Sequence, residues 1–306
     1  MTRERRAAWF ARAGRPNGRR SAIALALGIG AAPLAAQQKA PLVLNHLVAI
    51  LDSATYADLQ NSPFIAGQFA ATDRVGGGVD PVTSGLRLYG KYNYLVLAPP
   101  PPTSGPLATG RFLRPSGVGI VLSDERASAT GIKWTTTMVC SDCVTTSIDG
   151  DVWEMAPQWF GDSATGLAFL NILRYGAAGA KRLAAKDSLP ESNRSNGRFL
   201  APWFDAKKLF AYLTGATFAM PVDHIKQIMS QLRTQDVTVA ADGEGAIIRL
   251  DGFTLHLIPP YRGAGVKQLQ FALTHAAPAN PTYRFGPKSQ LRFGPGLIAV
   301  WDFDAK

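Results

Sequence analysis

The hydrophobic pattern of the chain begins with a run that is almost wholly apolar. Leu42 to Leu51 contains two polar residues, Asn45 and His46. A β-rich run of this length, apolar at successive positions, predicts a strand that is buried on both faces. The pair Asp52-Ser53 then offers an N-cap, so we expect a helix that ends before Pro63.

Shorter apolar runs continue the β pattern through residue 150. Phe64 to Thr72 is expected to form one more short helical piece before the next strand. The prolines from Pro99 to Pro102 cannot donate ladder hydrogen bonds, so the strand before them must end there. The pattern predicts four further strands: Gly85–Gly90, Tyr92–Leu97, Val118–Leu122 and Ile132–Val139.

The middle of the chain has a different character, and we interpret residues 151–213 as a helical insertion. Gly166 to Ala185 and Asp205 to Leu213 have helical patterns, and a polar stretch separates them. On this interpretation the insertion joins two β-rich modules, residues 37–150 and residues 214–306.

The last third of the chain repeats the order of the first. A strand at Thr214–Met220 precedes an amphipathic helix from about His224 to Arg233, and three strands follow the helix. These three strands are Val237–Ala240, Ala246–Leu250 and Phe253–Ile258. A β-α-β-β-β order therefore occurs twice, and the predicted fold class is α+β. We expect two β-α-β-β-β-type modules that form a cupped mixed sheet, with the helical insertion between them.

The first 36 residues have the pattern of a cleavable signal peptide. Seven arginines and one glutamate precede an apolar run from Ser21 to Gly30, and small residues lead to a cleavage site after Ala36. The run is shorter than the ~20 residues that cross a bilayer, so no transmembrane anchor is expected after cleavage. We therefore predict a periplasmic or secreted protein. The pair Arg19-Arg20 leaves both Sec and twin-arginine export open.

The basic charge of the chain lies mainly in this first segment. The whole chain has 32 basic and 22 acidic residues, a net charge of +10, whereas residues 37–306 have 25 and 21, a net charge of +4. This remainder has no cluster of lysine and arginine residues interleaved with aromatic residues. The composition therefore argues against a nucleic-acid partner.

Cys140 and Cys143 are the two cysteines of the chain. Outside the cytoplasm, their close spacing favours a local disulfide that shapes a turn. A redox-active pair and two free thiols are the alternatives. No second Cys/His pair has the spacing of a zinc finger, so structural zinc is not expected.

Three segments, Leu44–His46, Leu88–Leu97 and Asp251–Pro259, carry a resemblance to a known superfamily. Together with the doubled order, they resemble the vicinal oxygen chelate superfamily, which includes glyoxalases, extradiol dioxygenases and bleomycin-resistance proteins. The tail is more narrowly similar to an uncharacterised group of glyoxalase-like bacterial proteins. The segments of that second resemblance are Lys267–Leu273, Tyr283–Gly286 with Ser289 and Leu291, and Ala299–Phe303.

In that superfamily a divalent metal lies between paired modules and polarises the oxygens of a substrate. The resemblance implies His46 on the first strand and His256 on the last strand as metal ligands. Val96 stands where a glutamate would be expected, and a third ligand would have to come from elsewhere, such as Glu154 or Asp142. The alternative is that both histidines line a metal-free pocket for a small molecule.

The function expected first is binding of a small-molecule ligand in the cavity between the two modules, without the full metal-ligand set. Tyr92 and Tyr94 would bind the ligand together with His46 and His256, because strand alternation places residues 92, 94 and 96 on one face. A metal-dependent lyase, isomerase or dioxygenase that uses the two histidines is the second hypothesis. A structural partner-binding module of the cell envelope is the third. Two modules in one chain allow a monomer, and a homodimer stays open.

Overall fold

The computed structural model describes the chain from residue 42 onward, with gaps. The described residues are 42–74, 85–100, 117–124, 146–148, 151–155, 158–160, 168–175, 197, 200–235, 237–261, 263–277 and 282–304. Met1–Gln38 and Lys39–Lys306 are two separate units, and the described residues all lie in the second. The predicted signal peptide, the strand predicted at Ile132–Val139, and Cys140 and Cys143 lie outside the described residues.

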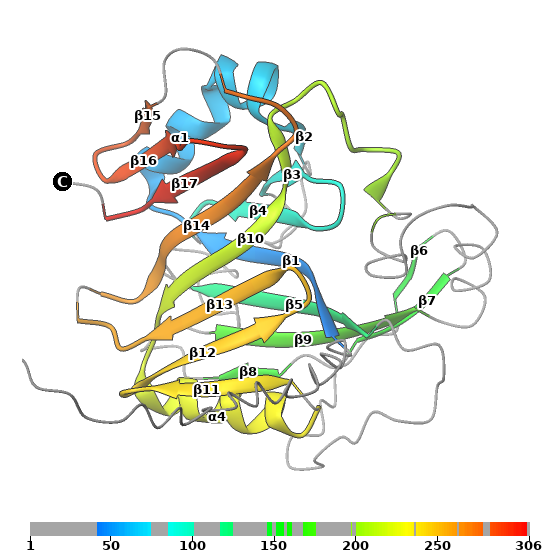
Figure 1. Cartoon of the computed structure of the whole chain (residues 1–306), viewed down its shortest axis with the longest axis vertical. Helices are drawn as coiled ribbons and strands as arrows, with labels where there is room; N and C mark the ends of the chain where they lie inside the picture. The colour runs from blue at the N-terminus through cyan, green and yellow to red at the C-terminus, as the bar shows by residue number, and fades with distance from the viewer. Residues whose placement is uncertain are drawn as a thin grey trace, which may run out of the picture. The chain divides into compact units, whose positions relative to one another are not determined.

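The first sheet is built around β1 (Leu42–Ile50), which is the apolar run at the start of the pattern. It leads into helix α1 (Ser53–Asn61), whose N-cap Asp52 accepts a hydrogen bond from the Thr55 amide at 2.9 Å. A π-helical turn, η1 (Ile65–Phe69), follows. Three more strands then join the sheet: β2 (Ala71–Arg74), β3 (Leu86–Tyr89) and β4 (Tyr94–Ala98). Their order is β2-β3-β4-β1, with β1 parallel to β4 (Figure 1).

The second sheet repeats this connection around β10 (Phe210–Ala219). Helix α4 (Val222–Arg233) follows β10 and buries one apolar face, as an amphipathic pattern requires. The next three strands are β11 (Thr238–Asp242), β12 (Gly245–Leu250) and β13 (Phe253–Ile258). The order is β11-β12-β13-β10, with β10 parallel to β13. The two parallel ladders match: His46–Ile50 pairs with Tyr94–Ala98, and Gly215–Ala219 pairs with Thr254–Ile258.

Both sheets continue on the far side of their first strand. Next to β1 lie β5 (Val118–Asp124) and then β9 (Ala168–Tyr175), and the short strands β6 (Thr146–Ile148), β7 (Asp151–Met155) and β8 (Gln158–Phe160) follow beyond β9. Next to β10 lie β14 (Gly265–Leu273), β17 (Ile298–Asp302), β16 (Ser289–Phe293) and β15 (Thr282–Phe285). Within the described residues the first sheet has nine strands and the second has eight.

Three predictions about the fold are wrong. The described residues form two mixed sheets with few helices, which agrees with the predicted α+β class, but there are two sheets where one cupped sheet was expected. Strand β9 lies where a helix was predicted over Gly166–Ala185, and β10 begins at Phe210, inside the helix predicted over Asp205–Leu213. The range 151–213, interpreted as a helical insertion, thus contributes β7, β8 and β9 to the first sheet. An apolar run beside neighbouring strands is buried on both faces and completes the ladder hydrogen bonds, so tertiary context outweighs the helical pattern.

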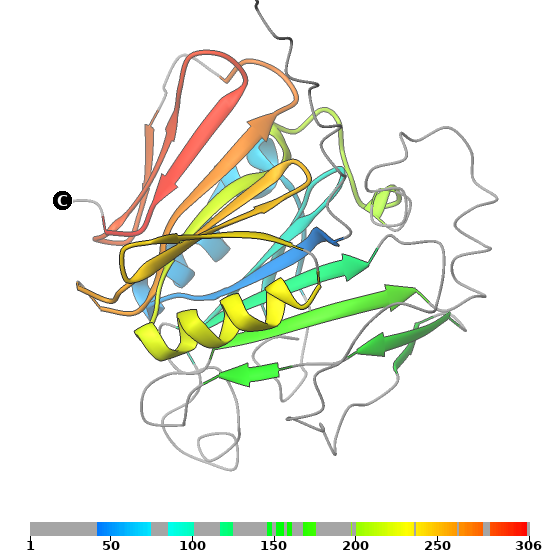
Figure 2. The ribbon, with the colours of Figure 1, turned by 60° about the horizontal axis from the view of Figure 1, so that its bottom comes forward.

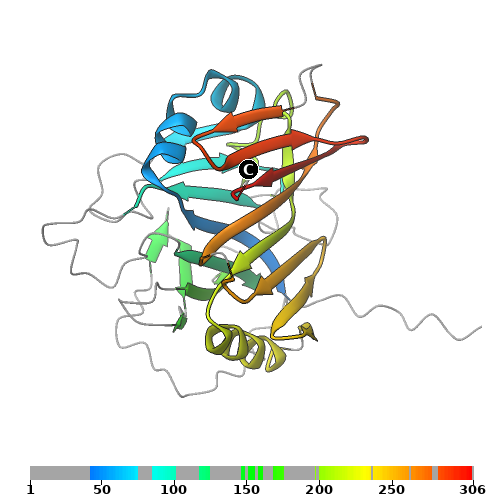
Figure 3. The ribbon, with the colours of Figure 1, turned by 90° about the vertical axis from the view of Figure 1, so that its left-hand side faces the viewer.

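One hydrophobic core joins the two sheets, because buried residues of both belong to a single cluster. Helix α4 packs on β11, β12 and β13, while α1 reaches from the first sheet to β15 of the second. Beside α1, the Phe64 ring stacks on Tyr283 with ring centroids 3.6 Å apart. Figure 2 shows α4 in the foreground, and Figure 3 shows α1 and α4 at opposite ends of the region where the sheets meet. No helix in the described part of the chain is long and apolar enough to span a membrane.

Candidate functional site

His46 lies on the face of the first sheet that points away from the core. Leu47 and Ala49 on the same strand enter the core, so the alternation of side chains puts His46 and Val48 on the opposite, outer face. One row of paired residues crosses this face from β3 to β9. We call it the outer row, and its members in strand order are Tyr89, Tyr94, His46, Val121 and Asn171.

A chain of hydrogen bonds sets the tautomer of the His46 imidazole. The Nδ2 atom of Asn45 donates to the Ser123 hydroxyl at 2.8 Å, which turns the Asn45 Oδ1 atom toward His46. This oxygen is only an acceptor, so His46 Nδ1, 2.8 Å away, donates its proton to it. The lone pair is therefore on His46 Nε2, which has no hydrogen-bond partner among the described residues.

The environment keeps the His46 imidazole neutral. Desolvation by the surrounding protein lowers the pKa of His46 to about 3, and the positive charge of Arg87 adds to the effect. The same desolvation raises the pKa of Tyr94 above its ordinary value. At neutral pH the pair is therefore an uncharged imidazole and an uncharged phenol, although each side chain keeps some exposed surface.

Four rings follow one another from Trp203 along the first three members of the outer row, with the pair Tyr89–Tyr94 tilted by 34° and the other two pairs stacked. The His46 ring lies on the Tyr94 ring, with centroids 4.3 Å apart and an interplanar angle of 22°. Tyr94 is followed by Tyr89 at 5.8 Å, and Tyr89 by Trp203 at 5.7 Å. Because Trp203 is 42% exposed, the stack extends from the protein surface to His46. Stacked rings of this kind form a wall on which another planar group can pack.

Two further side chains on the outer face have hydrogen-bonding groups that are not engaged. Arg87 lies on β3 one row from Tyr89, and its Nε atom is buried without a partner in the part of the chain that the structure describes. Asn171 is 2% exposed, and its Oδ1 atom likewise has no partner among the described residues. Buried polar atoms are nearly always paired, because an unpaired one costs about 1–3 kcal/mol. The face therefore holds a lone pair, a cation and an amide oxygen that the described residues leave unpaired.

Of the four residues predicted to bind a ligand, the structure brings His46 and Tyr94 together. His256 lies on β13 in the second sheet, beside Thr217 in register. Tyr92 precedes β4 and packs on Tyr212, with ring centroids 5.4 Å apart. Tyr92 therefore lies outside β4, the strand whose alternation was the reason for placing it on one face with Tyr94.

The described residues do not fit a metal site. No group of three or more His, Cys, Asp or Glu side chains among them is placed to hold a metal ion. Tyr94 lies opposite His46, while Val96, at the position expected for a carboxylate, pairs with Val48. Arg87 lowers the pKa of His46, so a divalent cation at Nε2 would be repelled by the same positive charge.

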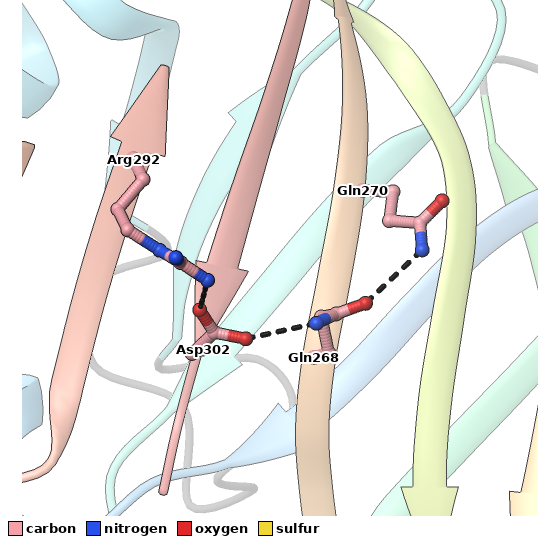
Figure 4. Close-up of polar contacts among 4 residues, drawn as sticks. All are labelled: Gln268, Gln270, Arg292 and Asp302. Carbon is pink, nitrogen blue, oxygen red and sulfur yellow. Dashed lines mark hydrogen bonds and ion pairs between the residues drawn. The ribbon is translucent and has the colours of Figure 1, made fainter. Parts of the chain in front are cut away.

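A separate polar network lies on the outer face of the second sheet. In Figure 4, Arg292 forms an ion pair with Asp302, which also accepts a hydrogen bond from the Gln268 amide at 2.9 Å. Gln268 accepts in turn from the Gln270 amide at 3.0 Å. Gln270 lies over Gly215, where a Cβ atom would be 3.1 Å from the Gln270 Oε1 atom. The network links β16, β17 and β14 and leaves its charges paired, unlike the charge of Arg87.

Sequence reasoning missed Arg87, Asn171, Tyr89 and Trp203 as site residues. Arg87 and Asn171 each interrupt an apolar strand, and a polar residue in a buried strand is a usable signal, since such residues are rarely buried without a partner. Their position near His46 could not be inferred, because it depends on the order in which β3, β4, β1, β5 and β9 pair.

No protein-family model and no curated protein matches the chain. Among solved structures, one similar chain is a hypothetical protein from Staphylococcus aureus, with 12% sequence identity and a TM-score of 0.41. That similarity covers 84% of this chain and 97% of the other. Another is a xylose isomerase-like TIM barrel/4-hydroxyphenylpyruvate dioxygenase fusion protein, with 15% identity and a TM-score of 0.37, over 73% of this chain and 35% of the other. The functional conclusion therefore depends on the residues of the site.

Proposed function

We propose that this chain is an exported protein that binds a small molecule on the outer face of its first sheet. The observation that carries the proposal is the presence of three unengaged groups, His46 Nε2, Arg87 Nε and Asn171 Oδ1, on the described part of that face. Folded proteins rarely leave such groups unpaired, and a ligand that pairs with them removes the free-energy cost. Export is supported by the signal-peptide pattern of the first 36 residues.

The outer face combines the contacts that small-molecule sites use. Such sites are mainly apolar and aromatic, with a few polar groups that orient the ligand. Here the aromatic part is formed by the ring stack, which reaches the protein surface at Trp203. Arg87 can donate to an acceptor, and His46 Nε2 can accept from an N–H or O–H group.

The electrostatics of the face favour binding over proton-transfer catalysis. A general base works best when its pKa lies near the working pH, so a pKa of about 3 makes His46 a weak base. The raised pKa of Tyr94 likewise keeps its proton in place. A metal-dependent lyase, isomerase or dioxygenase would need a ligand beyond His46 and His256, and the described residues supply no such cluster.

The β-α-β-β-β connection occurs around β1 and again around β10. It supports a second proposal, which concerns the superfamily to which the chain belongs. This connection is the feature by which the sequence resembles vicinal oxygen chelate proteins, some of which bind small molecules without chemistry. We propose that the chain is a distant member of that superfamily in which the metal ligands have been replaced and the binding role is kept. Val96, which stands where a glutamate would be expected and pairs with Val48 two residues from His46, is the replacement that supports this.

A ligand screen on paired histidine variants tests the binding function. Wild type, His46→Leu and His256→Leu are compared by thermal shift and isothermal titration calorimetry against a library of small metabolites and fragments. We expect compounds that bind wild type and His256→Leu but lose at least about tenfold in affinity with His46→Leu, since one hydrogen-bond acceptor is removed from the site. His256→Leu is the matched control because it makes the same exchange in the other sheet, and circular dichroism shows that each variant is folded.

Two outcomes of this screen would overturn the binding proposal. Compounds that lose affinity equally in both histidine variants, from a protein that contains stoichiometric metal by elemental analysis, would establish the metal hypothesis instead. A screen whose hits are all indifferent to His46→Leu would remove the outer face as the site.

A further inference from the structure

Two rows of paired residues cross the outer face of the second sheet through all eight of its strands. The first row consists of Thr238, Arg249, Thr254, Gly215, Gln270, Val300, Arg292 and Thr282. The second row consists of Ala240, Ile247, His256, Thr217, Gln268, Asp302, Gln290 and Arg284. We call them the open rows. Their neighbours along each strand, such as Ile248 and Trp301, enter the core, and helix α4 packs on that core side.

The open rows are accessible, unlike the outer row of the first sheet. Gly215 is their one buried member, and the Gln270 side chain lies over it. By contrast, Val121 and Asn171 of the outer row are each 2% exposed. Figure 4 shows four side chains of the open rows on β14, β17 and β16. A partner can therefore reach these rows without displacing any described part of the chain.

Two arginines without an acidic partner stand near the ends of the open rows. Arg249 on β12 and Arg284 on β15 are exposed, and neither forms an ion pair or hydrogen bond with the described residues. Asp302, the one acidic member of the rows, is already paired with Arg292. Six strand spacings separate β12 from β15, which is about 30 Å. A partner that contacts both arginines must therefore be extended and carry negative charges at intervals.

Between the two arginines the open rows carry neutral hydrogen-bonding side chains. Gln270 on β14 is exposed and lies three strand spacings from each arginine. One of its N–H groups donates to Gln268, so its second N–H group and its Oε1 atom are free among the described residues. An amide in this state donates and accepts at once, as a sugar hydroxyl does. The middle of the face therefore matches a partner that is rich in hydroxyl groups.

The open rows lack the side chains that bind proteins or membranes most strongly. They contain no Trp, Tyr, Phe, Leu or Met residue. Protein interfaces depend on a few aromatic anchors at their centre, and membrane-bound surfaces insert large apolar side chains. The predicted export of the chain would bring this face into contact with the polysaccharides outside the cytoplasm.

We propose that the open rows bind an acidic polysaccharide, a chain of sugars that carries carboxylate groups. The carboxylates bind Arg249 and Arg284, because a guanidinium matches two carboxylate oxygens. The hydroxyl groups between them bond to Gln270 and its neighbours. This inference goes beyond the proposed function, since it concerns the other sheet and a polymer. Failure of either one leaves the other standing.

Isothermal titration calorimetry of the purified protein at pH 7 tests the inference with polygalacturonate as the probe. Two matched polymers are carboxyl-reduced polygalacturonate, which lacks the charges, and polyglutamate, which lacks the hydroxyl groups. We expect wild type to bind polygalacturonate at least about fivefold more tightly than either of them. The affinity should fall when the salt concentration rises from about 0.05 to about 0.3 M, because the contacts are exposed.

Surface variants locate the binding on the open rows. Arg249→Gln/Arg284→Gln should weaken polygalacturonate by about 2- to 30-fold, since each exposed charge contact contributes modestly. Gln270→Ala should weaken it by about 2- to 10-fold. Lys226→Gln/Arg233→Gln is the control, because it removes two exposed cations from α4 on the opposite side of the sheet and should change the affinity less than twofold. Circular dichroism shows that each variant is folded.

Each contrary result has a distinct meaning. If polyglutamate binds as tightly as polygalacturonate, the face attracts any polyanion, and the polysaccharide is overturned. If the carboxyl-reduced polymer binds equally, the charge pairing is wrong. If the two double variants lose affinity equally, the open rows are not the site. Tighter binding to phosphatidylglycerol vesicles would assign the face to a membrane surface instead. If polygalacturonate does not bind at all, the inference fails, whereas the histidine screen on the first sheet is unaffected.

Discussion

Replacing Arg87 with methionine is expected to stabilise the ligand-free protein. The Nε atom of Arg87 is buried without a partner among the described residues, and an unsatisfied buried donor costs about 1–3 kcal/mol. Methionine is unbranched and adaptable, so it keeps much of the packing of the arginine stem. The exchange breaks no ion pair or hydrogen bond in the described structure. The free energy of unfolding should therefore rise by about 1–2 kcal/mol.

Urea unfolding at pH 7, followed by tryptophan fluorescence, measures this change without any ligand. The melting temperature should rise by about 2–4 °C for each kcal/mol in a domain of this size. Arg249→Met removes an exposed arginine and should stay within about 0.5 kcal/mol of wild type. If Arg87→Met instead lowers the free energy of unfolding by about 1 kcal/mol or more, the guanidinium is a structural group, and the reasoning that assigns it to a ligand is refuted.

Three other substitutions test separate parts of the structure. The folded pKa of His46, about 3, lies below its ordinary value of 6.5, so the unfolded chain takes up the proton first. The free energy of unfolding should fall as the pH drops from 6.5 toward 3, by up to about 1.4 kcal/mol per pH unit. In His46→Phe the urea midpoint should depend less steeply on pH than in wild type. An equal pH dependence in the two proteins would contradict this. Gly119→Ala should cost about 1–3 kcal/mol in urea unfolding, because its Cβ atom would lie 2.2 Å from the Phe169 ring. Adding Phe169→Leu should restore stability, and a double variant without this rescue would mean that the ring lies elsewhere. Ser289→Ala should cost about 1–3 kcal/mol, since buried Trp301 Nε1 donates to the Ser289 hydroxyl at 2.7 Å; a loss no larger than that of exposed Ser230→Ala would argue against this bond.

The elements that the sequence predicted well are those whose signals are local. Strand β13 has the bounds expected for it, Phe253–Ile258, because a turn at Asp251-Gly252 precedes it and Pro259-Pro260 stops it. The N-cap at Asp52 also lies where it was expected, since capping needs only a side chain a few residues from the amide it bonds. Turns and caps of this kind do not depend on the rest of the fold.

The site depends on pairings that no local signal specifies. Asn171 reaches the outer row because β9 runs parallel to β5, a crossover over more than forty residues of chain. The same residues had a helical pattern, so even the type of element was decided by the strand beside it. His46 and Tyr94 were predicted singly from their strands, but their contact comes from the parallel register of β1 and β4. Residue types could therefore be predicted, whereas the grouping of those residues required the sheet order.

The two halves of the chain repeat a connection but carry different chemistry at matching positions. From the equal registers of the two parallel ladders, His46 corresponds to Gly215, and His256 corresponds to Val96. The two histidines thus stand on different rungs of the repeat and are not equivalent ligands from its two copies. Above Gly215, the space that a side chain would occupy holds the Gln270 amide, which is part of a paired network. Because His46, Arg87 and Asn171 all belong to the first sheet, the proposed function predicts one ligand per chain rather than one per half.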